Sequence, residues 1–179
     1  DVIEPIDSRD AKNISSEKLP MPMLLCIGAV NTHLIKLGLR GYVSINVQTG
    51  DALDTHSFAT LIGVGATTVN PYLAFDSLFE RYSKKLFGNL SFDECVSRFI
   101  KSINLGLLKI MSKMGISVLS SYRGGCNFET VGLSRTIVKD FFPGVLSKIS
   151  GIGLTGIEKK IRNIHKQACL LYTSDAADD

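Results

Sequence analysis

The sequence lacks the features that mark several classes of protein. None of its four cysteines (Cys26, Cys95, Cys126 and Cys169) stands at the C-x-x-C spacing of a zinc or redox site. No uninterrupted apolar run reaches the roughly 20 residues of a membrane span, because polar residues break the longest candidate, residues 21–39. We therefore predict reduced, mostly structural thiols in a cytosolic type of compartment and no membrane partner.

An excess of charge of one sign is also missing. The formal net charge is only +3, and the Lys and Arg residues are scattered instead of forming blocks that alternate with aromatic residues. Both observations argue against a nucleic-acid partner. Hydrophobic residues make up 45% of the 179 residues and charged residues 21%. This composition supplies enough apolar surface for a folded core and excludes disorder of the whole chain.

The two ends lack the marks of natural termini. The chain begins at Asp1, without an initiator Met or a signal peptide, so we expect an interior piece of a longer chain. A basic helical pattern stops at Ala168, and residues 169–179 (CLLYTSDAADD) form a small acidic tail. Codons for these residues reproduce a transposon sequencing adaptor, which predicts adaptor read-through. The alternative is an ordinary disordered tail.

What the sequence does contain is an alternation of helix and strand patterns. Apolar residues at helical spacing predict a helix over 24–35, with Pro20 and Pro22 near its first turn and Gly38 just beyond its end. Alternating β-branched residues then predict a strand over 42–47. The two patterns are consecutive, as in a fold built from helix–strand units.

The next segment continues the alternation. Asp54 is placed to cap a helix that Gly63 and Gly65 end, and 67–69 can form a very short strand. Pro71 fits the start of a further helix that runs to about Phe87.

The second half opens on the longest predicted helix. Ser91 and Glu94 have the spacing of a capping box at its start, and Gly115 follows its end. Residues 116–120 predict the second clear strand. Two more helix starts are predicted: Ser134 before a helix over 136–142, and a capping box of Thr155 and Glu158 before the last helix.

This order of elements predicts an α/β fold with at least partly parallel strands. Only the strands over 42–47 and 116–120 are clear, so a complete barrel is excluded.

The loop over 120–125 is a candidate anion site. It follows a predicted strand, and its small residues can expose backbone N–H groups beside one arginine. The residues proposed to contact an anion are Ser121, Arg123 and Gly124. The alternative is a tight turn in which Arg123 makes structural hydrogen bonds. A second glycine-rich segment, 63–66, is interpreted as a helix end in preference to a phosphate loop, because it follows a helix.

Other chemistry-bearing residues are isolated. His33 and His56 lie on separate predicted helices, and no His, Cys, Asp or Glu cluster has metal-ligand spacing, so we predict no metal and no catalytic residue here. Cys126 follows two glycines, and we expect a buried thiol in preference to a reactive one. The roles of these three side chains are left open.

Several blocks of the sequence resemble, in order, the large chain of glutamate synthase. They cover about residues 20–156, and the most specific are KIMSKMGIS at 109–117 and SYRG at 121–124. The remaining blocks are PMPMLLCIGAVNTHLI at 20–35, QTGDA at 48–52, HSFATLIGVGA at 56–66, VNPYLAF at 69–75, FE at 128–129 and VGLS at 131–134. Departures at Asn31–His33, Ser57 and Gly125–Cys126 indicate a divergent member.

The resemblance implies an incomplete, degenerate β/α-barrel-like central domain with several helices and few strands. In the family this domain lies between a glutaminase, which releases ammonia, and an FMN-binding barrel with a [3Fe-4S] cluster. Ammonia reaches 2-oxoglutarate inside the protein, and FMN reduces the imine to L-glutamate. NAD(P)H or ferredoxin supplies the electrons, and a small electron-donating subunit is a possible partner.

The resemblance also divides the chain. It implies a polar segment at 1–19, the central domain at 20–142 and the start of the connection to the FMN domain at 143–168, before the tail at 169–179. The nucleophile of the glutaminase and the ligands of FMN and the cluster lie elsewhere in the family, so we expect this piece to bind no cofactor alone. Its expected role is structural, in a cytoplasmic or plastid enzyme. A non-enzymatic scaffold derived from the same fold is the alternative.

Overall fold

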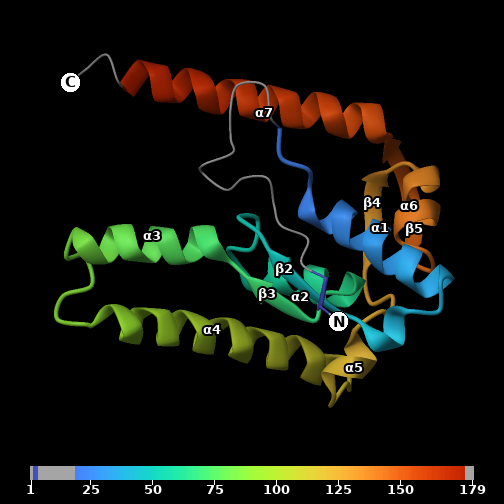
Figure 1. The fold of residues 1–179 in the computed structure, drawn as a ribbon, viewed down its shortest axis with the longest axis horizontal. Coiled ribbons are helices and arrows are strands. Elements are labelled where there is room, and N and C mark those ends of the chain that lie inside the picture. Colours follow the sequence, from blue (N-terminus) through green and yellow to red (C-terminus); the bar gives the residue numbers. More distant parts are fainter. Residues whose placement is uncertain (1, 4–18, 176–179) are drawn as a thin grey trace.

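The computed structural model describes the backbone of residues 2–3 and 19–175, and the side chains of residues 19–168. Its elements alternate between helices and short strands (Figure 1). In chain order they are β1 (Val2–Ile3), α1 (Met23–Lys36), the 3₁₀ helix η1 (Arg40–Tyr42), β2 (Ser44–Gln48), α2 (Thr55–Val64), β3 (Thr68–Asn70), α3 (Tyr72–Ser83), α4 (Phe92–Lys113), α5 (Leu119–Tyr122), β4 (Glu129–Leu133), α6 (Arg135–Phe141), β5 (Leu146–Ile152) and α7 (Leu154–Asp175).

All strand pairs in the described residues are parallel. One sheet has the order β1-β2-β3, and the other consists of β4 and β5. Helix α2 connects β2 to β3, and α6 connects β4 to β5, so each sheet contains a β-α-β unit. The predicted α/β class with parallel strands is therefore confirmed. No closed barrel forms within residues 2–3 and 19–175.

The main core lies where α1 and α2 meet strand β2. Ile27 of α1 and both Ile45 and Val47 of β2 are completely buried. Phe58 of α2 belongs to the same cluster and meets Phe99 of α4 edge-to-face at 6.4 Å between ring centroids. The pair of long helices α3 and α4 projects from this core, as Figure 1 shows.

The helix boundaries follow the local signals in the sequence. The carboxylate of Asp54 accepts a hydrogen bond from the Ser57 N–H at 2.8 Å, which confirms it as the N-cap of α2. Ser91 and Glu94 form the predicted capping box of α4. Gly115 follows α4 with a φ of 69°, a left-handed backbone conformation that other residues adopt only with strain.

The prediction of a strand over 116–120 is wrong. The Ile116 N–H donates to the carbonyl of Met111 at 2.9 Å, which completes the end of α4, and α5 begins at Leu119. A strand needs a neighbour for its backbone groups, and no described strand lies beside this segment. Ile116 instead packs against a buried cluster that includes Met111 and Tyr122.

Other boundaries differ as well. Helix α7 begins at Leu154, so Thr155 lies inside it and does not cap it, and Glu158 forms an ion pair with Arg162 at 2.8 Å. Strands β4 and β5 were not predicted. The predicted segment 1–19 lies almost entirely outside the described residues. So do the side chains of 169–179, although the backbone of α7 continues to Asp175.

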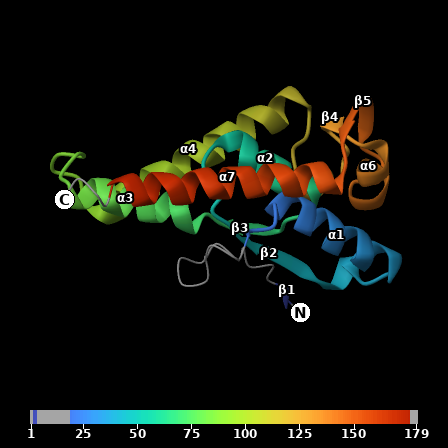
Figure 2. The ribbon, with the colours of Figure 1, turned by 90° about the horizontal axis from the view of Figure 1, so that it is seen from above.

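Two surfaces of the fold are unusually apolar. In β4 and β5, Val131, Leu146 and Ile149 are 55–64% exposed, although parallel sheets are normally covered on both faces. Helix α4 likewise exposes Leu105 and Leu108 at about 60%. Figure 1 shows α7 extending along one side of the molecule from its junction with β5, and Figure 2, seen from above, shows it crossing in front of the other elements.

Candidate functional site

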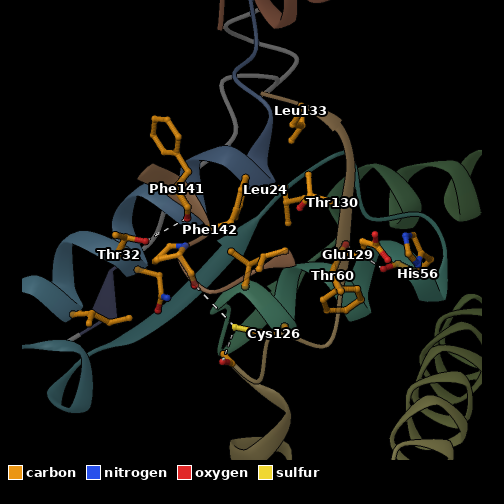
Figure 3. Close-up of a pocket in the computed structure, with 18 residues that line it drawn as sticks. Leu24, Thr32, His56, Thr60, Cys126, Glu129, Thr130, Leu133, Phe141 and Phe142 are labelled. Atoms are coloured by element: carbon orange, nitrogen blue, oxygen red, sulfur yellow. Dashed lines mark hydrogen bonds between the residues drawn. The ribbon is translucent and has the colours of Figure 1, made fainter. Parts of the chain in front are cut away.

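A cavity of about 260 Å³ lies between α1, α2, β4 and the end of α6 (Figure 3). Glycines shape two of its walls by close approach. A Cβ at Gly28 of α1 would lie 2.6 Å from the carbonyl oxygen of Phe141, and one at Gly63 of α2 would lie 2.2 Å from the Phe128 ring. The lining residues include Leu24, Thr32, His56, Thr60, Cys126, Glu129, Thr130, Leu133, Phe141 and Phe142.

The α6 side of the cavity is formed by a hydrogen bond from Thr32 and by the buried ring of Phe142. The Thr32 hydroxyl donates to the Phe141 carbonyl at 3.3 Å and so joins α1 to α6. Phe142 is 8% exposed and packs with Ile137 and Val138. This side is a fixed wall, because its side chains are packed in an apolar cluster.

Two polar side chains that line the cavity, those of Thr60 and Glu129, make contacts within the fold. The Thr60 hydroxyl donates to the carbonyls of Ser57 at 2.9 Å and His56 at 3.1 Å. Glu129 forms an ion pair with Lys148 at 3.4 Å. His56 is exposed at the same end (Figure 3). His33 is also exposed but lies on the last turn of α1, outside the cavity lining.

The prediction of a buried thiol at Cys126 is wrong. The residue is exposed, and its φ of 52° places it in a tight turn after two glycines. Its Sγ lies 3.7 Å from the Gly124 carbonyl oxygen and 4.0 Å from that of Pro143. The turn directs the thiol toward the end of α6 instead of the core (Figure 3). Cys95 is buried and Cys26 is half-buried, with its pKa raised by burial.

The predicted anion loop has engaged backbone donors. The N–H of Ser121 donates to the Val118 carbonyl, and that of Arg123 donates to the Leu119 carbonyl. The Gly124 N–H donates to the Gly63 carbonyl at 2.8 Å. An anion at this loop would therefore have to be held by side chains. Binding of an anion by Ser121, Arg123 and Gly124 stays a prediction.

Sequence reasoning missed Arg40, which lies near Arg123. Its guanidinium donates to three neutral oxygens: Asn31 Oδ1 at 2.6 Å, the Val43 carbonyl at 2.6 Å and the Gly65 carbonyl at 2.7 Å. Burial lowers the pKa of Arg40, and the charge of Arg123 lowers it further. No local signal in the sequence connects these two arginines, because only the fold brings them together.

The segment 63–66 is a helix end, as predicted. Gly65 is the C-cap of α2 with a φ of 147°, and its N–H donates to the carbonyls of Leu61 and Ile62. Among the described residues, no group of three or more His, Cys, Asp or Glu side chains is placed to hold a metal ion. No helix in the described ranges is long and apolar enough to cross a membrane.

The sequence of this chain matches one protein family and several curated proteins. The profile of the glutamate synthase central domain matches residues 8–134. The chain is 56% identical over 148 residues to the NADPH glutamate synthase large chain of Azospirillum brasilense, an alignment that covers 83% of this chain and 10% of that protein.

Two further relatives agree. The corresponding Bacillus subtilis chain is 42% identical over 157 residues, covering 88% of this chain and 10% of that protein. A ferredoxin-dependent glutamate synthase of Pyropia yezoensis is 42% identical over 165 residues, covering 87% and 11%. The chain thus spans about a tenth of the length of these curated relatives.

Proposed function

This chain belongs to the glutamate synthase family and matches its central domain, and on that premise we propose that it is part of a large chain that makes L-glutamate. The reaction combines 2-oxoglutarate with ammonia released from glutamine and reduces the product. The identity to three large chains over most of this sequence is the observation that carries the proposal.

The role of this piece within the enzyme is structural. It separates the glutaminase from the reducing site and forms part of the wall along which ammonia passes. The occupied polar groups of the cavity support a packing role, since Thr60 and Glu129 are both engaged in contacts within the fold. A wall for ammonia must exclude bulk water, which suits the largely apolar cavity between α1, α2 and β4.

The finer fold assignment is an incomplete, degenerate β/α barrel. The two parallel β-α-β units support it, and the exposed apolar faces of β4, β5 and α4 are surfaces that adjoining parts of a larger fold can cover. In this assignment residues 20–142 form the central domain, and 143–168, with β5 and the first part of α7, begin the connection to the FMN domain. The glutaminase and the FMN barrel of the same chain are then its partners.

The cofactors belong to other parts of the proposed enzyme. FMN and a [3Fe-4S] cluster would supply the redox chemistry, with electrons from NAD(P)H or ferredoxin and, in some types, a small electron-donating subunit. In this proposal the residues that hold FMN and the cluster lie in the FMN barrel, so neither cofactor is placed on this chain. The proposed compartment is the cytoplasm, or a plastid in a photosynthetic eukaryote.

The first test is to sequence the source locus across the codon for Ala168 and to assay the complete encoded chain. We expect the reading frame to continue into an FMN domain with clustered cysteines, and the purified product to form glutamate from glutamine and 2-oxoglutarate. A frame that truly encodes residues 169–179 and then stops would contradict the enzyme assignment and favour a scaffold.

A second test addresses the ammonia wall. Thr60→Phe places a ring in the cavity, and we expect it to lower glutamate formation from glutamine while formation from added ammonium chloride persists. Ser77→Phe, on the exposed face of α3, is the matched control and should change neither rate. Equal rates for wild type and Thr60→Phe with both nitrogen sources would show that ammonia does not pass this cavity.

A further inference from the structure

The guanidinium of Arg123 has a buried nitrogen without a partner. Its Nε is shielded from solvent and has no acceptor. No side-chain hydrogen bond or ion pair joins Arg123 to another residue within the described ranges. Arg123 as a whole is half-buried, so part of its guanidinium can be approached from the surface. Buried polar groups in proteins are nearly always paired, and this one therefore indicates a missing acceptor.

Arg40, the second arginine at this end of α2, has no acidic partner within the described ranges. The three hydrogen bonds of Arg40 all go to neutral oxygens, those of Asn31, Val43 and Gly65. Burial lowers the pKa of Arg40 most, and the positive charge of Arg123 lowers it further. The pair is thus short of negative charge.

The C-terminal end of α2 brings the two arginines together. The Gly65 carbonyl accepts from Arg40, and the Gly63 carbonyl accepts from the N–H of Gly124, the residue after Arg123. The partial negative charge at a helix C-terminus favours cations. It amounts to about half an elementary charge, which does not balance two guanidiniums.

We propose that Arg123 and Arg40 form a carboxylate-binding site at the C-terminal end of α2, with Arg123 supplying the free guanidinium edge. A carboxylate matches this edge because its two oxygens can accept parallel hydrogen bonds from the two terminal nitrogens, which are not among the buried atoms without a partner. Arg40 contributes positive charge and keeps its hydrogen bonds to α2 and η1. The site goes beyond the proposed function, which gives these two arginines no role.

The carboxylate has two possible sources, a free dicarboxylate or an Asp or Glu side chain of the remainder of the large chain. Hydrogen exchange measured by mass spectrometry on the complete natural chain distinguishes them, because it reports local stability in peptides that cover residues 119–125 and η1. The variants are Arg123→Gln and Arg123→Lys. The control is Arg98→Gln, which removes an exposed arginine from α4. Succinate is the probe, compared with NaCl at equal ionic strength.

A free dicarboxylate predicts about tenfold slower exchange in wild type at a succinate concentration of ten times Kd. Arg123→Gln abolishes this response, and Arg98→Gln retains it. A side-chain carboxylate predicts no response to succinate but faster exchange in Arg123→Gln, with Arg123→Lys between it and wild type. That difference must shrink as NaCl is raised, because salt screens the ion pair.

Two results overturn the site. One is equal exchange in wild type and Arg123→Gln with no response to succinate. The other is a difference that salt does not change and that Arg123→Lys shares in full, which is the behaviour of packing alone. If the glutamate synthase assay failed, these outcomes could still be distinguished, because hydrogen exchange is measured without enzyme turnover.

Discussion

The contact between β4 and β5 yields the sharpest prediction about stability. A Cβ at Gly151 of β5 would lie 2.1 Å from the carbonyl oxygen of Gly132 in β4, whereas Cβ contacts under 3.0 Å are essentially never found. The strands would have to separate by roughly 0.9 Å. A hydrogen bond such as that from the Ser134 N–H to the Ile152 carbonyl, now 2.9 Å, would then exceed the usual limit.

The cost follows from the bonds lost. Two backbone hydrogen bonds at about 1 kcal/mol each give about 2 kcal/mol. The reduced freedom of the unfolded chain when Gly becomes Ala offsets about 0.5 kcal/mol. Gly151→Ala should therefore destabilise the pair of strands β4 and β5, here called the ribbon, by about 1.5 kcal/mol. This is roughly a tenfold change in the equilibrium between the closed and the opened ribbon.

The assay is hydrogen exchange of peptides covering β4 and β5 in the complete chain. We expect about tenfold faster exchange in Gly151→Ala. Gly41→Ala is the matched control, because no atom lies within 4 Å of a Cβ at Gly41, and it should leave the ribbon unchanged. Exchange in Gly151→Ala within twofold of wild type would refute the argument that the strands must separate.

Two further predictions concern single side chains. The pKa of Asp54 is lowered by hydrogen bonds from Ser57, so its cap stabilises α2 above the unfolded pKa of about 3.9 and is lost as pH falls through the folded pKa. Asp54→Ala should lower the stability of α2 by about 1 kcal/mol at neutral pH. Hydrogen exchange in α2 should show that the difference from wild type vanishes in acid. A difference that persists in acid would contradict the N-cap role of the Asp54 carboxylate. Iodoacetamide should label Cys126 before Cys26 and Cys95, since Cys126 is exposed, Cys95 is buried and burial raises the pKa of Cys26; peptide mass spectrometry showing equal labelling would contradict this.

The sequence was a good guide where structure is decided locally. Capping at Asp54 and Ser91 depends on residues within one turn, and both caps are present. The strand predicted over 116–120 failed because pairing depends on a distant neighbour. Strands β4 and β5 were missed because glycines interrupt their apolar pattern, and their register contains irregularities between the paired positions.

The candidate site shows the same division. The loop around Arg123 was singled out from its composition, although the strand that it was expected to follow is absent and Leu119–Tyr122 form α5 instead. The lack of a partner for the Nε of Arg123 and the presence of Arg40 beside it depend on where α2 ends relative to η1 and α5. Burial of the Cys126 thiol was predicted from average behaviour, whereas the residue is exposed, in a turn with a left-handed backbone.

The exposed ribbon of β4 and β5 has a consequence for synthesis on the ribosome. The core around Ile27, Ile45 and Phe58 is drawn from α1, β2 and α2, so it can close soon after these residues emerge. The apolar side chains of Leu146, Ile149 and Ile152 in β5 are 43–60% exposed in the described chain, and in the proposed enzyme the adjoining domain that is made later would cover them. At about 5–20 residues per second, each hundred residues of delay leaves this surface open for roughly 5–20 s. During that interval a nascent chain is a natural client for chaperones that bind apolar extended segments.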